Sequence, residues 1–132
     1  MQIKEKFKEL WFSKVEKVAE KCSNIEAFNL MKQIEHGNIS DEEKEIIAKQ
    51  LEEMNIHDIN AVWYVGFMIS DIQKCIFQYR INLNLINSVN QINGCLNSDS
   101  YWSNVWDDNI NSEEAKNLKE LGNLMQELVR YL

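Results

Sequence analysis

Proline is absent from the 132-residue chain, and glycine occurs only four times. Both residue types commonly interrupt helices, so their scarcity favours long helices. Long apolar stretches are also lacking, because the longest run, residues 61–69, has nine residues and is too short to cross a bilayer. The first 22 residues carry charges every few positions and lack the apolar segment of a signal peptide. We therefore expect a cytoplasmic protein that does not associate with membranes.

Cysteine and histidine are too few and too scattered to indicate a reactive centre. Cys22, Cys75 and Cys95 lie among apolar residues without paired spacing, which predicts reduced cysteines in the core. His36 and His57 are far apart and form no pattern typical of a metal cluster. No phosphate-binding loop or catalytic motif is recognisable. We expect no metal, no cofactor and no enzymatic activity.

Positive charge is scarce as well. The chain has 21 acidic and 14 basic residues, a net charge of −7. Residues 22–58 have a net charge of −6 and residues 99–132 a net charge of −4, so the acidity is concentrated in two regions. Because binding to nucleic acid needs a positive face, this distribution argues against a nucleic-acid partner and favours a basic protein.

The apolar residues that remain recur at intervals of three and four, the period of an amphipathic helix. The length suits one domain, residues 1–132, built around one core. We predict an all-α fold, a single-domain bundle of about five helices around a long central helix at about residues 58–93. The first helix is expected to run from about residue 3 to residue 22.

The prediction of the central helix is based on a series of apolar residues that extends from Val62 to Ile86. A competing pattern lies within it, because residues 77–85 alternate between apolar and polar as a half-buried strand would. The helical series is longer and begins earlier, and it is the interpretation we favour. Gly94 is expected to end this helix.

Several helix ends have recognisable capping residues. Ser23 with Glu26 and Ser40 with Glu43 have the spacing of a capping box, and Asp58 is placed to cap a further helix. His36 and Gly37 are predicted to end the second helix with a left-handed glycine, and Asn111 with Glu114 to start the last one.

The segment around residues 101–108 is the most informative for function. It combines aromatic residues, which dominate protein interfaces, with acids able to pair with lysine or arginine. The candidate anchors and acids are Tyr101, Trp102, Trp106, Asp107 and Asp108. As an alternative, Trp102 and Trp106, four residues apart, fold into the core from a short helix.

In size, acidity and helicity the whole chain resembles the bacterial immunity proteins that neutralise toxin domains, including those of nuclease colicins and of contact-dependent growth inhibition. The resemblance implies that this protein binds a cognate toxin domain, a nuclease, and covers its basic groove. The acids that would face the toxin, beside the aromatic segment, are Glu42, Glu45, Glu52, Glu53, Asp107 and Asp108. The alternative is a homodimeric helical regulator or scaffold in which the central helix pairs with its twin.

Overall fold

The computed structural model describes residues 2–107 and 110–132, and every regular element in these ranges is helical. The prediction of an all-α fold is confirmed. The elements in chain order are α1 (Glu5–Leu10), the π-helical turn η1 (Trp11–Val15), α2 (Glu16–Ser23), α3 (Ile25–His36), α4 (Asp41–Glu53), α5 (Ile59–Phe77), α6 (Leu83–Leu96), α7 (Asp99–Val105), α8 (Glu113–Leu128) and the 3-10 turn η2 (Val129–Tyr131). These described ranges thus contain more helices than the five or so that were predicted.

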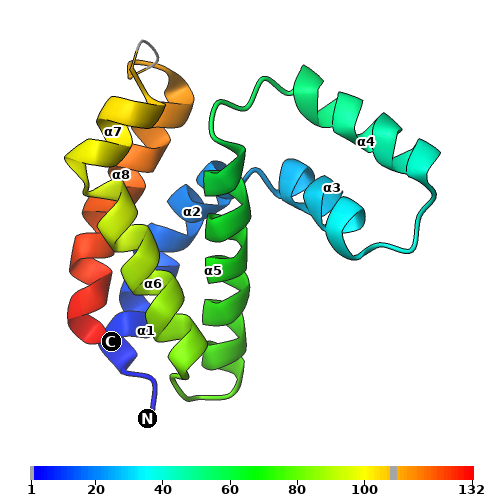
Figure 1. Cartoon of the computed structure of the whole chain (residues 1–132). Coiled ribbons are helices and arrows are strands. Elements are labelled where there is room, and N and C mark those ends of the chain that lie inside the picture. Colours follow the sequence, from blue (N-terminus) through cyan, green and yellow to red (C-terminus); the bar gives the residue numbers. More distant parts are fainter. Residues whose placement is uncertain (1, 108–109) are drawn as a thin grey trace.

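Four long helical elements form the body of the molecule (Figure 1). The continuous rod of α1, η1 and α2 packs against α5 and α8, and α6 packs against the same two helices from the other side. The main apolar core lies between them and includes Phe7, Trp11, Leu85 and Leu121, all without solvent-exposed surface. The helices therefore form a four-membered bundle around one core.

The predicted long helix at residues 58–93 is wrong, because the chain reverses direction between α5 and α6. Tyr79 adopts a left-handed conformation with φ 55°, and the Asn82 side chain caps α6 by accepting a hydrogen bond from the Leu85 amide at 2.9 Å. The apolar period continues through the turn since both helices face the same core, so periodicity could not show the break. Within the described ranges the competing strand is not formed either, apart from one bridge between Gln2 and Arg80.

The predicted end at Gly94 is also wrong, because α6 continues to Leu96. Two other helix starts lie where they were predicted. Ser40 accepts a hydrogen bond from the Glu43 amide at 3.2 Å, and Asp58 accepts one from the Ala61 amide at 3.1 Å.

Other predicted helix ends need correction. Ser23 is the buried last residue of α2, and the left-handed Asn24 caps α3 in its place. Gly37 follows α3 in an extended conformation, with φ −77°. For α8 the capping residue is Ser112, one position after the predicted Asn111. Both α3 and α8 are present, but in each case a neighbouring residue with the same capping chemistry takes the place of the predicted cap.

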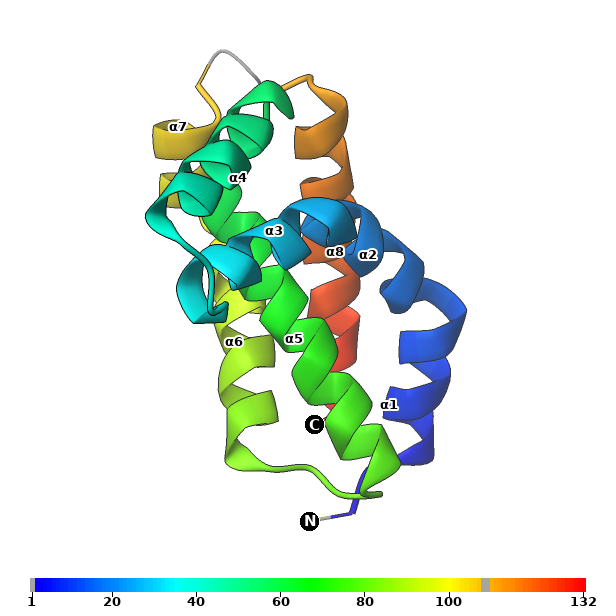
Figure 2. The ribbon, with the colours of Figure 1, turned by 90° about the vertical axis from the view of Figure 1, so that its right-hand side faces the viewer.

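Residues 25–56, which we call the arm, contain α3 and α4 and project from the bundle beside α5 (Figures 1 and 2). A second apolar cluster joins the arm to the outer face of α5 through Phe28, Ile47, Leu51 and Val62. Gly66 makes this contact possible, because a Cβ atom there would lie 2.4 Å from the Phe28 ring. Helix α5 is thus covered on one side by the bundle and on the other by the arm.

Candidate binding surface

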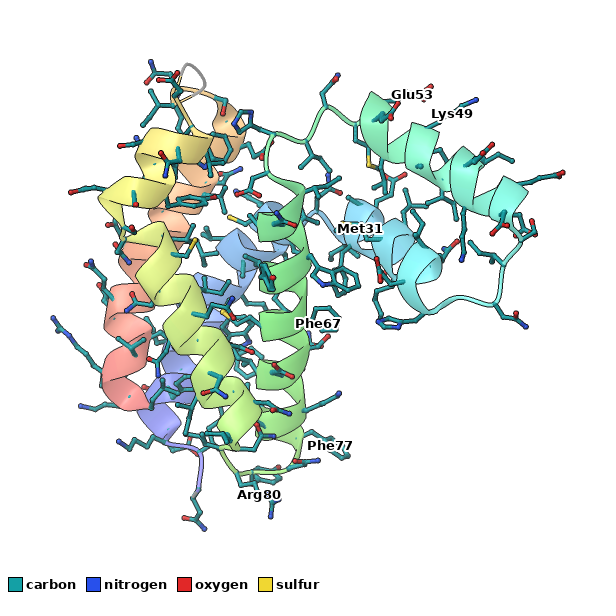
Figure 3. The ribbon with its side chains drawn as sticks, in the orientation of Figure 1. Met31, Lys49, Glu53, Phe67, Phe77 and Arg80 are labelled. Atoms are coloured by element: carbon teal, nitrogen blue, oxygen red, sulfur yellow. The ribbon has the colours of Figure 1, made fainter. Side chains whose placement is uncertain are left out.

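The arm carries most of the negative charge of the protein. It has eight acidic and three basic residues, a net charge of −5, whereas the rest of the chain has a net charge of −2. The predicted partner-binding acids of α4 are all exposed; they are Glu42, Glu45, Glu52 and Glu53. Figure 3 shows Glu53 and Lys49 on α4, which packs against α3 in the projecting arm. These acids are therefore available to a partner.

An apolar side chain lies among these acids. Ile46 is 58% exposed, and Glu42, Lys49 and Glu53 share its helix face at spacings of four, three and seven residues. The opposite face of α4 packs inward through Ile47 and Leu51. An exposed isoleucine within a charged helix face combines an apolar contact with ionic ones, which is the composition of a protein-binding surface.

A groove separates the C-terminal half of α4 from the start of α8. Its volume is about 690 Å³, and it is lined by Ala48, Leu51, Glu52, Asn55, Ile56, His57, Ile59, Ser112 and Glu114. Glu52 belongs to the first acidic region of the sequence and Glu114 to the second. The fold therefore brings the two acidic regions together at this groove, which the sequence alone did not indicate.

Glu114 has a structural task in the groove. Its two carboxylate oxygens accept hydrogen bonds from the backbone amides of His57 and Asp58, each at 3.0 Å. The His57 ring contacts the Val105 carbonyl oxygen and lies 4.5 Å from the Trp106 ring, measured between centroids. These contacts hold the segment that connects α4 to α5 against the ends of α7 and α8.

The three aromatic side chains of residues 101–106 are buried or half-buried. Trp106 has 0% exposure and belongs to the main core, so of the two alternatives for this residue the core position holds. It is not part of a surface that a partner contacts directly. Trp102 is half-buried and donates a hydrogen bond from Nε1 to the Leu96 carbonyl at 2.8 Å. The Lys119 ammonium group lies 5.2 Å from the centroid of the Trp102 ring.

Tyr101 is half-buried and engaged with Asp58. Its hydroxyl donates a hydrogen bond to the Asp58 carboxylate at 2.7 Å. Burial and this carboxylate raise the pKa of the Tyr101 phenol above its ordinary value. Asp107 is exposed, whereas Asp108 lies outside the described residues. The anchor predicted from Tyr101, Trp102 and Trp106 is therefore mostly engaged within the chain, and the acids of α4 are the more accessible part of the predicted site.

The cysteines are divided between core and surface. Cys22 and Cys75 are buried as predicted, but Cys95 is exposed. Partial desolvation of the sulfur, with a further contribution from Asp58, raises the pKa of the Cys95 thiol. The thiol is thus protonated at neutral pH and is a poor nucleophile.

In the ranges that the structure describes, no three metal-binding side chains of histidine, cysteine, aspartate or glutamate come together. None of the described helices combines the length and the apolar character needed to cross a membrane.

The chain has no match among protein-family models, curated proteins or solved structures. Its function must be argued from its own surface.

Proposed function

We propose that this protein is a non-enzymatic, cytosolic immunity protein that binds a basic toxin domain of the nuclease class and blocks its substrate groove. The observation that carries the proposal is the arm, a projecting element with a net charge of −5 and an exposed isoleucine among its acids. An acidic surface of this kind attracts a cationic groove and speeds association with it. Inhibition is steric and electrostatic and uses no reaction at the surface of the protein.

In this proposal the contact lies on α4. Glu42, Glu45 and Glu53 pair with lysine or arginine of the toxin, and Ile46 fills an apolar pocket between those pairs. Glu52 lies at the edge of the groove, where Leu51 and Ile56 offer apolar contact to the stem of a long basic side chain. Asp107 contributes only to the rim.

The test begins with the product of the neighbouring gene. If that product is toxic when expressed alone, its toxic domain should bind the purified protein, and co-expression should restore growth. Charge reversal at Glu45, Glu52 and Glu53 to lysine should weaken binding measured by calorimetry by well over about tenfold, since several charge pairs become repulsive. Glu52 and Glu53 lie in the last turn of α4, where lysine suits the helix dipole, and Glu45 is exposed, so the fold is retained.

A matched control reverses three exposed acids outside the arm, Glu9, Glu120 and Glu127, and so changes the net charge by the same amount. Binding should then fall only modestly, through loss of long-range attraction. Equal losses in the two triple variants would show that the arm is not the contact surface. A neighbouring product that is harmless alone, or toxicity that co-expression leaves unchanged, would remove the immunity function.

A further inference from the structure

The turn between α5 and α6, residues 77–83, forms an exposed apolar end of the bundle that we call the tip. Phe77 is 85% exposed, Tyr79 70% and Leu83 69%, the three highest values among the exposed large apolar side chains. The two rings alone present roughly 300 Å² to solvent, given the usual area of an aromatic side chain. Several large apolar side chains exposed on one turn are a candidate contact site.

The tip is held firmly in place. Ile81 is buried in the main core and anchors the turn from within. The Arg80 amide donates a hydrogen bond to the Cys75 carbonyl at 3.1 Å, and the Ile3 amide donates one to the Tyr79 carbonyl at 3.4 Å. Tyr79 keeps a left-handed conformation that is costly for a residue with a large side chain. The exposed rings are therefore presented by a fixed backbone.

Basic residues surround these rings. The sequence from residue 72 to residue 98 contains no aspartate or glutamate, although the whole chain has a net charge of −7. Lys74 lies one helical turn before Phe77, and the Lys8 ammonium group lies 5.7 Å from the centroid of the Tyr79 ring. Arg80 is exposed within the tip itself. Figure 3 shows Phe77 and Arg80 at the end of the bundle away from α4.

We propose that the tip docks on an anionic phospholipid bilayer. Phe77, Tyr79 and Leu83 enter the interfacial region, and Lys8, Lys74 and Arg80 contact the lipid phosphates. Phenylalanine and tyrosine with adjacent lysine and arginine are the residues that anchor proteins at such interfaces. The tip is a turn at the end of the bundle, where it can meet a flat surface (Figures 1 and 2). The proposal adds to the immunity function and does not depend on it.

The charge distribution also orients the docked molecule. The arm and the tip lie toward opposite ends of α5 (Figures 1 and 2). An anionic surface attracts the tip and repels the arm, so the arm points away from the bilayer. This revises the expectation of no membrane association, which considered spanning segments and the first helix but not a turn.

Flotation with lipid vesicles tests the proposal. The full chain should float with phosphatidylcholine vesicles that contain phosphatidylglycerol and not with pure phosphatidylcholine, and high salt should release it. The double variant Phe77→Ser/Tyr79→Asn should lower the bound fraction by about tenfold or more, through loss of both rings. Asparagine accepts the positive φ at position 79, and Phe77 has few native contacts to lose, so this variant folds.

Ile25→Ser is the matched control, because it removes an exposed apolar side chain from the arm and should leave flotation unchanged. Lys74→Glu/Arg80→Glu should abolish flotation with anionic vesicles while the rings remain. The proposal is overturned if the wild-type chain does not bind anionic vesicles, or if the double variant binds them equally well. Binding of the tip to a single-stranded oligonucleotide, or tip-dependent self-association, in the absence of vesicle binding also overturns it.

Discussion

Glu114 connects parts of the chain that are 56 and 57 residues apart, through two hydrogen bonds to backbone amides. Hydrogen bonds to a charged group contribute more to stability than neutral ones do, and a backbone amide that loses its partner must be hydrated instead. Glu114→Ala should therefore lower the free energy of unfolding by about 1–3 kcal/mol. Denaturant unfolding measures this loss, and hydrogen exchange should show faster exchange of the amides at His57 and Asp58. Glu113→Ala, at an exposed neighbour, is the control and should leave both amides protected.

The buried Cys22 thiol should make the stability of the protein depend on pH. Burial, reinforced by Glu120 and Glu114, raises the pKa of its thiol from the ordinary value of 9.0 to about 12. The unfolded chain releases this proton at lower pH than the folded protein does, so the contribution of the thiol to stability is complete below pH 9 and is lost between pH 9 and 12. Stability should fall over this window.

The measurement is the unfolding free energy as a function of pH for the wild type and for Cys22→Ala. Tyr101 acts in the same direction, since its pKa is also raised, so Tyr101→Phe is included in both chains. Cys22→Ala should make the fall of the unfolding free energy between pH 9 and 12 shallower. A loss of packing would lower the whole curve without changing its slope. Parallel curves for the two chains would contradict the buried, protonated thiol.

Single residues account for both the successes and the failures of sequence reasoning. Ser40 and Asp58 were recognised as caps because their side chains act locally on amides three residues ahead. The capping role of Asn24 depends on a left-handed backbone conformation, which no local sequence pattern indicates. The role of Glu114 depends on residues far away in the chain, so sequence spacing could not reveal it.

At the level of elements, Gly66 and Gly94 have opposite roles in helices. A Cβ atom at Gly66 would collide with Phe28, whereas nothing lies within 4 Å of the corresponding position at Gly94. Gly66→Ala should destabilise the protein by about 1–3 kcal/mol through overpacking between α5 and the arm. Gly94→Ala should stabilise it by about 0.5–1 kcal/mol, because alanine favours the helical conformation. Thermal unfolding of the two variants provides the comparison, and a Gly66→Ala variant that is as stable as the wild type would contradict the packing assigned to Phe28.

The break between α5 and α6 explains why the central helix was predicted wrongly. Apolar spacing reports which residues face the core, and Ile81 and Leu85 face it on the far side of the turn as Ile72 does before it. The signals of the break are Asn82 as a cap and the polar residues around Tyr79. In the sequence these features also fit the alternating pattern of a half-buried strand.

For the whole molecule, the sequence predicted the all-α class and the two acidic regions, but not how the arm relates to the bundle. The apolar residues of α5 suggested surface available for pairing with a second copy. The structure uses that surface within one chain, because Val62 is buried and Trp63 and Phe67 are partly buried against Phe28 and the rest of the arm. Whether a segment is helical depends mostly on its local sequence. Whether its apolar face packs against the same chain or against a second copy depends on contacts between distant segments.

The protein should accordingly be a monomer when it is free in solution. With α5 covered on both sides, the dimer interface of the scaffold hypothesis is occupied, and the net charge of −5 on each arm opposes close approach of two copies. Sedimentation velocity at micromolar concentration and moderate salt should show one species of 15.6 kDa. High salt serves as a control, because it screens repulsion between arms and still leaves α5 covered. A tight dimer under both conditions would favour the regulator or scaffold over the simple inhibitor, whereas a dimer only at high salt would show that charge alone keeps the copies apart.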